Sequence, residues 1–241
     1  MKQQNKIIVV GATSGLGRML AERYIRDGHV VGIVGRRGDK LAEVAKGHSE
    51  VHCLKADVTD ISQIAVHLSA LAGEMGGLDL LVLCSGVGRM NPDLDYGLEL
   101  PTVDTNVRGW TAVTDWAFSF FMQQGYGHLA AISSVAGIRG LAPAPAYSAS
   151  KAYQIHYLEA LRQRARISRK RDVRPGFVRT PLLSHPEKLF WVDEPEKAVR
   201  AIYRAISARK KKAVITRRWA FLAPWMRIAP EWLVAKILGK A

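Results

Sequence analysis

Short apolar runs alternate with amphipathic stretches along the chain, and this alternation predicts parallel strands joined by helices. The apolar runs, rich in Val, Ile and Leu, predict strands at residues 6–10, 30–34, 51–56, 78–83, 128–132 and 213–216. Helical periodicity predicts helices at residues 16–26, 40–45, 61–75, 98–123, 147–166 and 195–208. Such a series is typical of an α/β fold with a doubly wound parallel sheet covered by helices on both faces. No linker rich in Gly, Ser or Pro divides it, so we expect one domain over residues 1–241.

The composition is that of an ordinary globular protein, with 48% hydrophobic and 23% charged residues among the 241. The two cysteines are too few for a disulfide scaffold and lack ligand spacing, so we expect a cytoplasmic protein without a metal site. The polar N-terminus predicts no secretion signal. No run of about 18 uncharged apolar residues occurs, which argues against a membrane-spanning helix.

The net charge of +14 comes from two segments rather than from the whole chain. Residues 162–179 hold eight Arg and Lys against Asp172, and residues 209–241 hold nine against Glu231. The rest of the chain is nearly neutral. We therefore expect no nucleic-acid partner, because no known binding module accompanies the two basic patches.

The first predicted strand leads directly into a glycine-rich turn, Gly11-Ala12-Thr13-Ser14-Gly15-Leu16-Gly17. Glycines at a strand-to-helix turn allow the backbone to approach a pyrophosphate that sits at the helix N-terminus. The turn predicts dinucleotide contacts from Gly11, Thr13, Ser14, Gly15, Leu16 and Gly17. The alternative is a tight turn without a ligand.

The second predicted strand ends in Gly35-Arg36-Arg37, where an NAD site would offer a carboxylate to the ribose 2′-hydroxyl. Two guanidinium groups instead suit a 2′-phosphate, which favours NADP(H) over NAD(H) as the cofactor. The alternative is that Arg36 and Arg37 belong to a solvated loop without a ligand. Asp57 follows the third predicted strand. It is a candidate for contact with the adenine amino group or for the N-cap of the next helix.

Tyr147 and Lys151 are four residues apart and therefore share one face of a predicted helix. Because a nearby ammonium stabilises a phenolate, we expect Lys151 to lower the pKa of Tyr147 and make it a general acid and base. Ser134 lies thirteen residues upstream of Tyr147 at a strand end, and Asn106 lies inside the predicted helix 98–123. Taken singly, Ser134 as a turn cap and Asn106 as a backbone-bonded residue are the structural alternatives.

In order and spacing, these residues resemble the short-chain dehydrogenase/reductase family over nearly the whole chain. The matching positions are Gly11 to Gly17, Asp57, Gly86, Asn106, Ser134, Tyr147, Lys151 and Pro175-Gly176 followed by Thr180. The resemblance implies a Rossmann fold with strand order 3-2-1-4-5-6-7. It also implies hydride transfer between a nicotinamide and a carbonyl or alcohol carbon. Together with Arg36 and Arg37, it leads us to expect an NADP(H)-dependent enzyme that acts on a small-molecule carbonyl or alcohol as a homodimer or homotetramer.

The resemblance implies a role for each matching residue. Tyr147 would be the general acid and base, and Ser134 would orient the substrate oxygen. Lys151 would hold the nicotinamide ribose, and Asn106 would position a water that links Lys151 to solvent. Further cofactor contacts are expected from Val58, Gly86, Tyr147, Lys151, Pro175, Gly176, Val178 and Thr180.

Two segments depart from the family pattern. Leu83-Cys84-Ser85-Gly86 stands where the family carries Asn-Asn-Ala-Gly, and Cys84 is either a small packing residue or a reactive thiol. Residues 167–174 are charged where an apolar strand is expected, which predicts a shortened or distorted sixth strand. That departure favours a second function, a dinucleotide-binding sensor or scaffold with little chemistry.

The two segments after Thr180 are expected to contact substrate or a partner. The segment of about residues 180–194 stands where the family places its substrate lid. Its apolar side chains would either contact a bulky or hydrophobic carbonyl substrate or pack in the core or at an interface. Residues 217–241 form an apolar and basic helical extension, which predicts packing on the lid or on a second subunit. The alternative is contact with an anionic membrane surface, as in a reductase of a lipid-like carbonyl.

Overall fold

The computed structural model describes residues 4–164, 169–174, 194–215, 225, 226, 228–230, 232 and 233, with backbone alone at 169–174. Its strands are β1 (Lys6–Val10), β2 (Val30–Gly35), β3 (Val51–Lys55), β4 (Leu80–Leu83), β5 (His128–Ile132), β6 (Arg169–Arg174) and β7 (Lys212–Val214). Its helices are α1 (Gly15–Arg26), α2 (Gly38–Ala45), α3 (Ile64–Glu74), α4 (Tyr96–Val103), α5 (Trp110–Gln124), α6 (Pro145–Arg164) and α7 (Pro195–Ser207). Apart from the predicted helix 98–123, which is divided, each strand and helix predicted from the sequence is present, with ends shifted by up to three residues.

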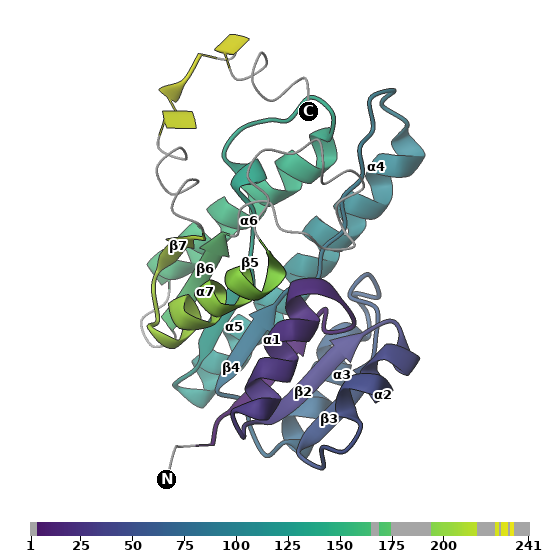
Figure 1. Cartoon of the computed structure of the whole chain (residues 1–241), viewed down its shortest axis with the longest axis vertical. Helices are drawn as coiled ribbons and strands as arrows, with labels where there is room; N and C mark the ends of the chain where they lie inside the picture. The colour runs from purple at the N-terminus through teal and green to yellow at the C-terminus, as the bar shows by residue number, and fades with distance from the viewer. Residues whose placement is uncertain are drawn as a thin grey trace.

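The strands form one parallel sheet in the order β3-β2-β1-β4-β5-β6-β7, as predicted (Figure 1). The order reverses at β1, whose last residue Val10 pairs with Val34 of β2 on one side and with Leu83 of β4 on the other. In open α/β sheets, ligands bind in the crevice outside the carboxyl ends of the strands at such a reversal. The turns that follow β1 and β4 therefore flank the expected binding crevice.

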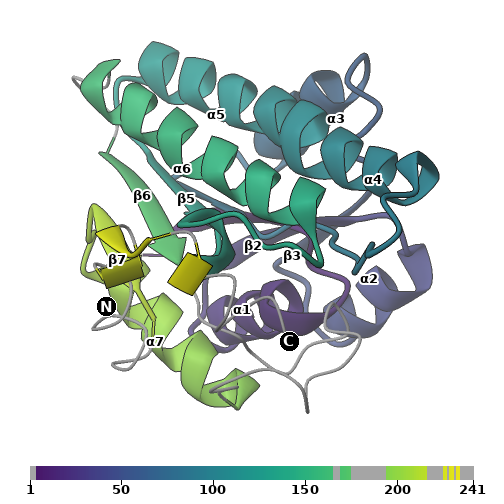
Figure 2. The same ribbon diagram turned by 90° about the horizontal axis from the view of Figure 1, so that it is seen from above.

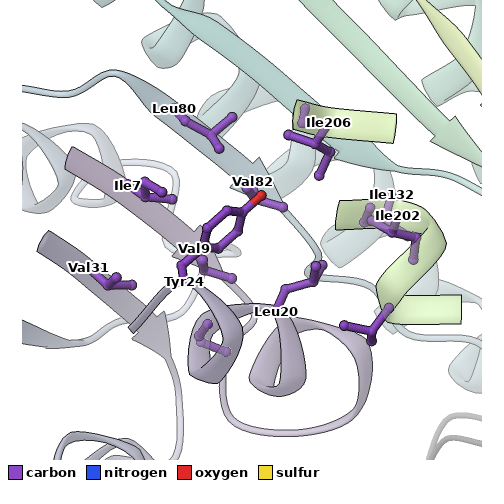
Figure 3. Packing of buried hydrophobic residues seen from close by; sticks show 14 of the residues in the cluster. Ile7, Val9, Leu20, Tyr24, Val31, Leu80, Val82, Ile132, Ile202 and Ile206 are labelled. Carbon is purple, nitrogen blue, oxygen red and sulfur yellow. The ribbon is translucent and has the colours of Figure 1, made fainter. Parts of the chain in front are cut away.

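Helices cover both faces of the sheet: α1, α2 and α7 lie on one side, and α3 to α6 on the other (Figure 2). Successive residues of β1 point to opposite faces, so Ile7 and Val9 pack on one side while Ile8 and Val10 pack on the other. Figure 3 shows the first of these two cores, which the strands share with side chains from α1 and α7. Burial on both faces explains why the strand sequences are continuously apolar.

The single helix predicted at residues 98–123 is in fact α4 and α5 joined by a π-helical segment, Asp104–Gly109. The N–H of Trp110 donates to the carbonyls of Thr105 and Val107. In a regular α-helix its acceptor would be the carbonyl of Asn106. Such π-helical turns are frequent at functional sites, and this one places Asn106 at the irregularity.

The sixth strand differs from its prediction, since β6 has six residues and is not shortened. Residues 169–173 of β6 pair in parallel with residues 128–132 of β5, and β7 pairs on the other side of β6. The hydrogen bonds between strands are made by backbone groups alone. An extended segment can therefore pair with the backbone N–H and C=O groups at the edge of β5 even without an apolar sequence.

Several predicted features lie outside the described residues. They are the cofactor candidates Pro175, Gly176, Val178 and Thr180, the expected lid except Glu194, and most of the C-terminal extension. Within the described part of the chain, no helix is both long and apolar enough to cross a bilayer.

Candidate active site

The turn between β1 and α1 forms a backbone cradle at the reversal of the strand order. Gly11 has a φ of 90°, and its N–H donates to the Val34 carbonyl over 2.9 Å. A Cβ on Gly11 would lie 2.6 Å from the backbone nitrogen of Ser85, and one on Gly17 would lie 2.1 Å from the Gly11 carbonyl oxygen. Both positions therefore require glycine. Because α1 begins at Gly15, its free N–H groups line the cradle and favour an anion there.

Two guanidinium groups gather beside the cradle. Arg37 Nη2 donates to Thr13 Oγ1 over 2.8 Å and to Ser14 Oγ over 2.9 Å. Arg36 Nη1 lies 3.7 Å from Asp57 Oδ2. Arg37 is thus tied to the glycine-rich turn, which a merely solvated loop would not require, and the pair fits a phosphate carried on a nucleotide ribose.

Asp57 does not cap the next helix, and this alternative is wrong. Helix α3 begins at Ile64, whereas Asp57 Oδ1 accepts a hydrogen bond from the N–H of Thr59 over 3.0 Å. The carboxylate therefore braces its own turn and faces Arg36. The neighbouring Val58 is 7% exposed, and its side chain belongs to the core beneath α3 and α5. The cofactor contact predicted for Val58 would therefore be made by its backbone atoms.

Tyr147, Ser134 and Lys151 come together as the sequence predicts. Tyr147 and Lys151 lie on the first turns of α6, with Lys151 Nζ 5.7 Å from the centroid of the Tyr147 ring. Ser134 follows β5, and its hydroxyl is hydrogen-bonded to Tyr147. The same hydroxyl accepts from the N–H of Ala136 over 3.1 Å, so Ser134 is also the turn cap that its position suggested.

The pKa of Tyr147 moves opposite to the predicted direction. Burial raises it above its usual value, and the hydrogen bond to Ser134 lowers it by less. Loss of water disfavours the phenolate, and this cost exceeds the stabilisation that the hydroxyl of Ser134 provides. Charge placed near the phenol oxygen therefore decides whether Tyr147 ionises near neutral pH.

The loop that follows β4 passes directly against these groups. A Cβ on Gly86 would lie 3.3 Å from both Asn106 Oδ1 and Lys151 Nζ, which places the predicted cofactor residue Gly86 beside Lys151. A Cβ on Gly88 would lie 2.5 Å from Tyr147 Cδ2. Gly88 was not predicted, because a lone glycine in a loop gives no signal of what it touches.

Asn106 is fully buried and fixes this loop. Its Oδ1 accepts from the N–H of Val87 over 2.9 Å, and its Nδ2 donates to the Val87 carbonyl over 2.7 Å and to Ser150 Oγ over 3.0 Å. Its backbone carbonyl accepts from Gln154 Nε2 over 2.9 Å. Asn106 is thus a backbone-bonded polar residue, and the water that it would position stays a prediction.

Two polar residues at the site were missed in the sequence. Gln154 lies three residues after Lys151, and a polar residue at that helical spacing was its signal. Glu99 of α4 accepts from the N–H of Ala146 over 2.9 Å through Oε2, and from Asn91 Nδ2 over 2.5 Å through Oε1. The Glu99 carboxylate thereby lies at the N-terminus of α6, where it binds the N–H of the residue that precedes Tyr147. No sequence motif predicts this contact.

The departure at Cys84-Ser85 keeps the segment after β4 in close approach to the glycine-rich turn, since a Cβ on Gly11 would lie 2.6 Å from the Ser85 nitrogen. Burial raises the pKa of the Cys84 thiol to about 12, and Cys84 packs against the core beneath α1, which favours the packing role over the reactive thiol. The buried hydroxyl of Ser85 has no hydrogen-bond partner among the described residues. In the same part of the chain, no cluster of three His, Cys, Asp or Glu is arranged to bind a metal.

Comparisons with known proteins agree with this geometry. The family of short chain dehydrogenases matches residues 5–188. An uncharacterized oxidoreductase of Myxococcus xanthus is 38% identical over 183 residues, which cover 73% of this chain and 72% of the relative. A 2-dehydro-3-deoxy-L-rhamnonate dehydrogenase (NAD(+)) of Sphingomonas sp. is 32% identical over 64% of this chain and 63% of its own length.

A solved structure extends the likeness to almost the whole fold. The short chain dehydrogenase of Burkholderia cenocepacia in complex with NADP has a TM-score of 0.84 and covers 98% of each chain at 22% identity. At that identity it supports the fold alone. The family match over most of the sequence, together with the seven-stranded parallel sheet and its crevice, establishes that this chain belongs to the short-chain dehydrogenase family of oxidoreductases.

Proposed function

We propose that this protein is an NADP(H)-dependent oxidoreductase that interconverts a small-molecule carbonyl and its alcohol, with Tyr147 as general acid and base. The observation that carries the proposal is one juxtaposition. The hydroxyl groups of Tyr147 and Ser134 are hydrogen-bonded to each other, near the ammonium of Lys151. These groups lie against the loop that follows β4, beside the glycine cradle. A proton donor thus lies next to a phosphate-binding turn in one crevice.

The residues at the crevice fit a pyridine dinucleotide. The cradle at Gly11 and Gly17 has no room for a Cβ, which is the requirement for close approach of a pyrophosphate. Arg36 and Arg37 would bind a 2′-phosphate, and the β4 loop at Gly86 leads toward Lys151, which would hold the second ribose. The hydride in this reaction comes from, or goes to, the bound nicotinamide.

The protein's own groups would handle the proton. In reduction, Tyr147 donates its hydroxyl proton to the carbonyl oxygen as that oxygen gains charge, while Ser134 holds the same oxygen by a hydrogen bond. In oxidation, the phenolate of Tyr147 takes the proton back. Burial disfavours that phenolate, and the ammonium of Lys151, 5.7 Å from the centroid of the ring, would favour it.

The choice of NADP(H) over NAD(H) rests on Arg36 and Arg37 rather than on relatives. The Burkholderia structure contains NADP, whereas the Sphingomonas relative is named for NAD(+). In this chain, no carboxylate stands at the end of β2, and Arg37 already reaches the turn that would cradle the phosphates. We also propose the cytoplasmic location and the homodimer or homotetramer that the sequence suggested.

Replacing Tyr147 by Phe tests the assignment. A positioned general acid contributes about 10² to 10⁴ in rate, so turnover of an aldehyde or ketone panel, followed as NADPH absorbance, should fall by that factor. NADPH binding should persist, because the phenyl ring keeps the packing. In the unsubstituted protein, alcohol oxidation should rise with pH and carbonyl reduction should fall, since the first needs the phenolate and the second the phenol.

The control is Tyr126→Phe, which changes an exposed tyrosine on the loop after α5. This control should leave both rates and their pH dependence unaltered. Equal turnover by the Tyr147→Phe variant would remove Tyr147 from the chemistry. Nucleotide binding without turnover of any tested substrate would instead favour the sensor or scaffold function.

A further inference from the structure

Gln154 joins Lys151 to Asn106 inside the protein. Its side chain is fully buried on α6, three residues after Lys151. Lys151 Nζ donates to Gln154 Oε1 over 3.1 Å, and Gln154 Nε2 donates to the backbone carbonyl of Asn106 over 2.9 Å. One amide group thus bridges the ammonium and the π-helical segment.

The chemistry of the two partners fixes the orientation of this amide. An ammonium only donates hydrogen bonds and a backbone carbonyl only accepts them. The oxygen of the Gln154 amide must therefore face Lys151, and its nitrogen must face Asn106. The reverse orientation would set donor against donor and acceptor against acceptor, so the bridge has one arrangement.

The irregular helix provides the acceptor. The N–H of Trp110, the regular α-helical partner of the Asn106 carbonyl, donates instead to Thr105 and Val107. Buried carbonyls need a donor, and the side chain of Gln154 on α6 provides one to the π-helical segment.

The bridge connects further to Tyr147. The Asn106 side chain donates to Ser150 Oγ, and that hydroxyl donates to the Tyr147 carbonyl over 2.8 Å. The same Asn106 side chain holds Val87, next to Gly86 and Gly88. Lys151, Tyr147 and the β4 loop are therefore tied to a single buried network that includes Gln154.

We propose that Gln154 is a positioning residue, which holds the Lys151 ammonium beside Tyr147 by bridging it to the Asn106 backbone carbonyl. This inference deepens the proposed function and rests on it for its catalytic consequence. A neutral amide suits the task because it accepts from the ammonium without cancelling its charge. A carboxylate at the same place would pair with Lys151 and weaken its effect on the phenolate of Tyr147.

Two substitutions of similar size separate positioning from packing. Gln154→Leu removes the acceptor that faces Lys151, and Gln154→Glu replaces it with a charged one. Gln163→Leu, at an exposed position of the same helix, is the matched control. Folding of every variant is checked by circular dichroism and thermal unfolding.

The first measurement needs neither substrate nor nucleotide. The rate at which acetic anhydride labels Lys151, relative to the exposed Lys46, is read by mass spectrometry, since only the neutral amine reacts. Gln154→Leu should speed labelling of Lys151, and Gln154→Glu should slow it. Gln163→Leu should leave it unchanged. A packing role would instead speed labelling in both Gln154 variants by opening the site.

The second measurement is the pH profile of alcohol oxidation. Both Gln154 variants should move the apparent pKa to higher pH, Gln154→Glu further than Gln154→Leu. A displacement of one pH unit lowers the rate at neutral pH about tenfold. A lower rate at every pH without displacement would contradict the proposal, as would labelling equal to that of the control. If the unsubstituted protein turns over no substrate, the proposed function fails, while the labelling result still decides the role of Gln154.

Discussion

The phenol of Tyr147 is subject to opposing influences, and the balance between them is the centre of the proposed chemistry. Burial raises its pKa, whereas the hydrogen bond with Ser134 lowers it. The ring packs against Gly88, and the ammonium of Lys151 lies 5.7 Å from its centroid. Small displacements of the ring therefore change both its ionisation and its approach to a substrate oxygen.

Gly88→Ala tests how closely this ring is confined. The new Cβ would lie 2.5 Å from Tyr147 Cδ2, so the ring or the β4 loop must shift. Misplacement by about 1 Å costs as much as 100-fold in rate, and we expect kcat to fall about 10- to 100-fold. Circular dichroism should show an intact fold.

Gly73→Ala is the control for this substitution, because a Cβ at that position of α3 meets nothing within 4 Å. It should leave kcat unchanged. Equal kcat for Gly88→Ala and the unsubstituted protein would mean that Tyr147 does not act from the position it occupies here.

At the scale of elements, the sequence predicted the strands and helices well because their signals are local. The alternation of apolar residues is repeated over whole segments, and the glycine-rich turn marks the junction of β1 and α1. The division of helix 98–123 was missed, because a π-helical turn depends on its partner across the fold, Gln154, rather than on its own residues. The full length of β6 was missed for a similar reason, since its charged residues give no strand signal and the ladder of β5 pairs with them.

The same distinction separates the predicted site residues from the missed ones. Tyr147, Lys151 and Ser134 lie in recognisable spacings, and the structure brings them together. Glu99 contacts Ala146, 47 positions away in the chain, and no spacing in the sequence predicts that contact. Gln154 has the helical spacing to Lys151 as a signal, but its bond to Asn106, 48 positions away, has none. The roles of all these residues remain predictions that the variants test.

Glu99→Ala tests the attachment of α6 to α4. The substitution removes the acceptor of the N–H of Ala146, which directly precedes Tyr147. It also removes one of the two acceptors of Asn91 Nδ2, the other being the Asp95 carbonyl. The loss of charge-assisted hydrogen bonds should lower the free energy of unfolding by about 1 to 2 kcal/mol in urea titrations. The rate of Tyr147-dependent turnover should fall as well.

Glu43→Ala provides the comparison, since Glu43 pairs with Lys40 and Arg18 on the surface. Surface ion pairs contribute little to stability, so this variant should unfold close to the unsubstituted protein. If the two variants unfold at the same urea concentration, Glu99 does not anchor α6.

At the scale of the whole molecule, the reversal of strand order at β1 places all of these groups at one crevice. The turns after β1, β2 and β3 supply the cradle, the two arginines and Asp57, while the segments after β4 and β5 supply Gly86, Gly88 and Ser134. One half of the sheet thus presents most of the residues proposed to bind the nucleotide, and the other half Ser134, which is proposed to assist proton transfer. A dinucleotide lying across the reversal would join the two.

The central claim is that this crevice binds NADPH through Arg36 and Arg37. The most direct test is a titration of the purified protein with NADPH and with NADH, followed by nicotinamide fluorescence, beside the Arg36→Ala and Arg37→Ala variants. Each lost phosphate contact of about 1.5 to 3 kcal/mol should weaken NADPH binding about 10- to 100-fold and leave NADH binding nearly unchanged. Failure of both nucleotides to bind, or equal binding of NADH and NADPH that neither variant alters, would contradict the account.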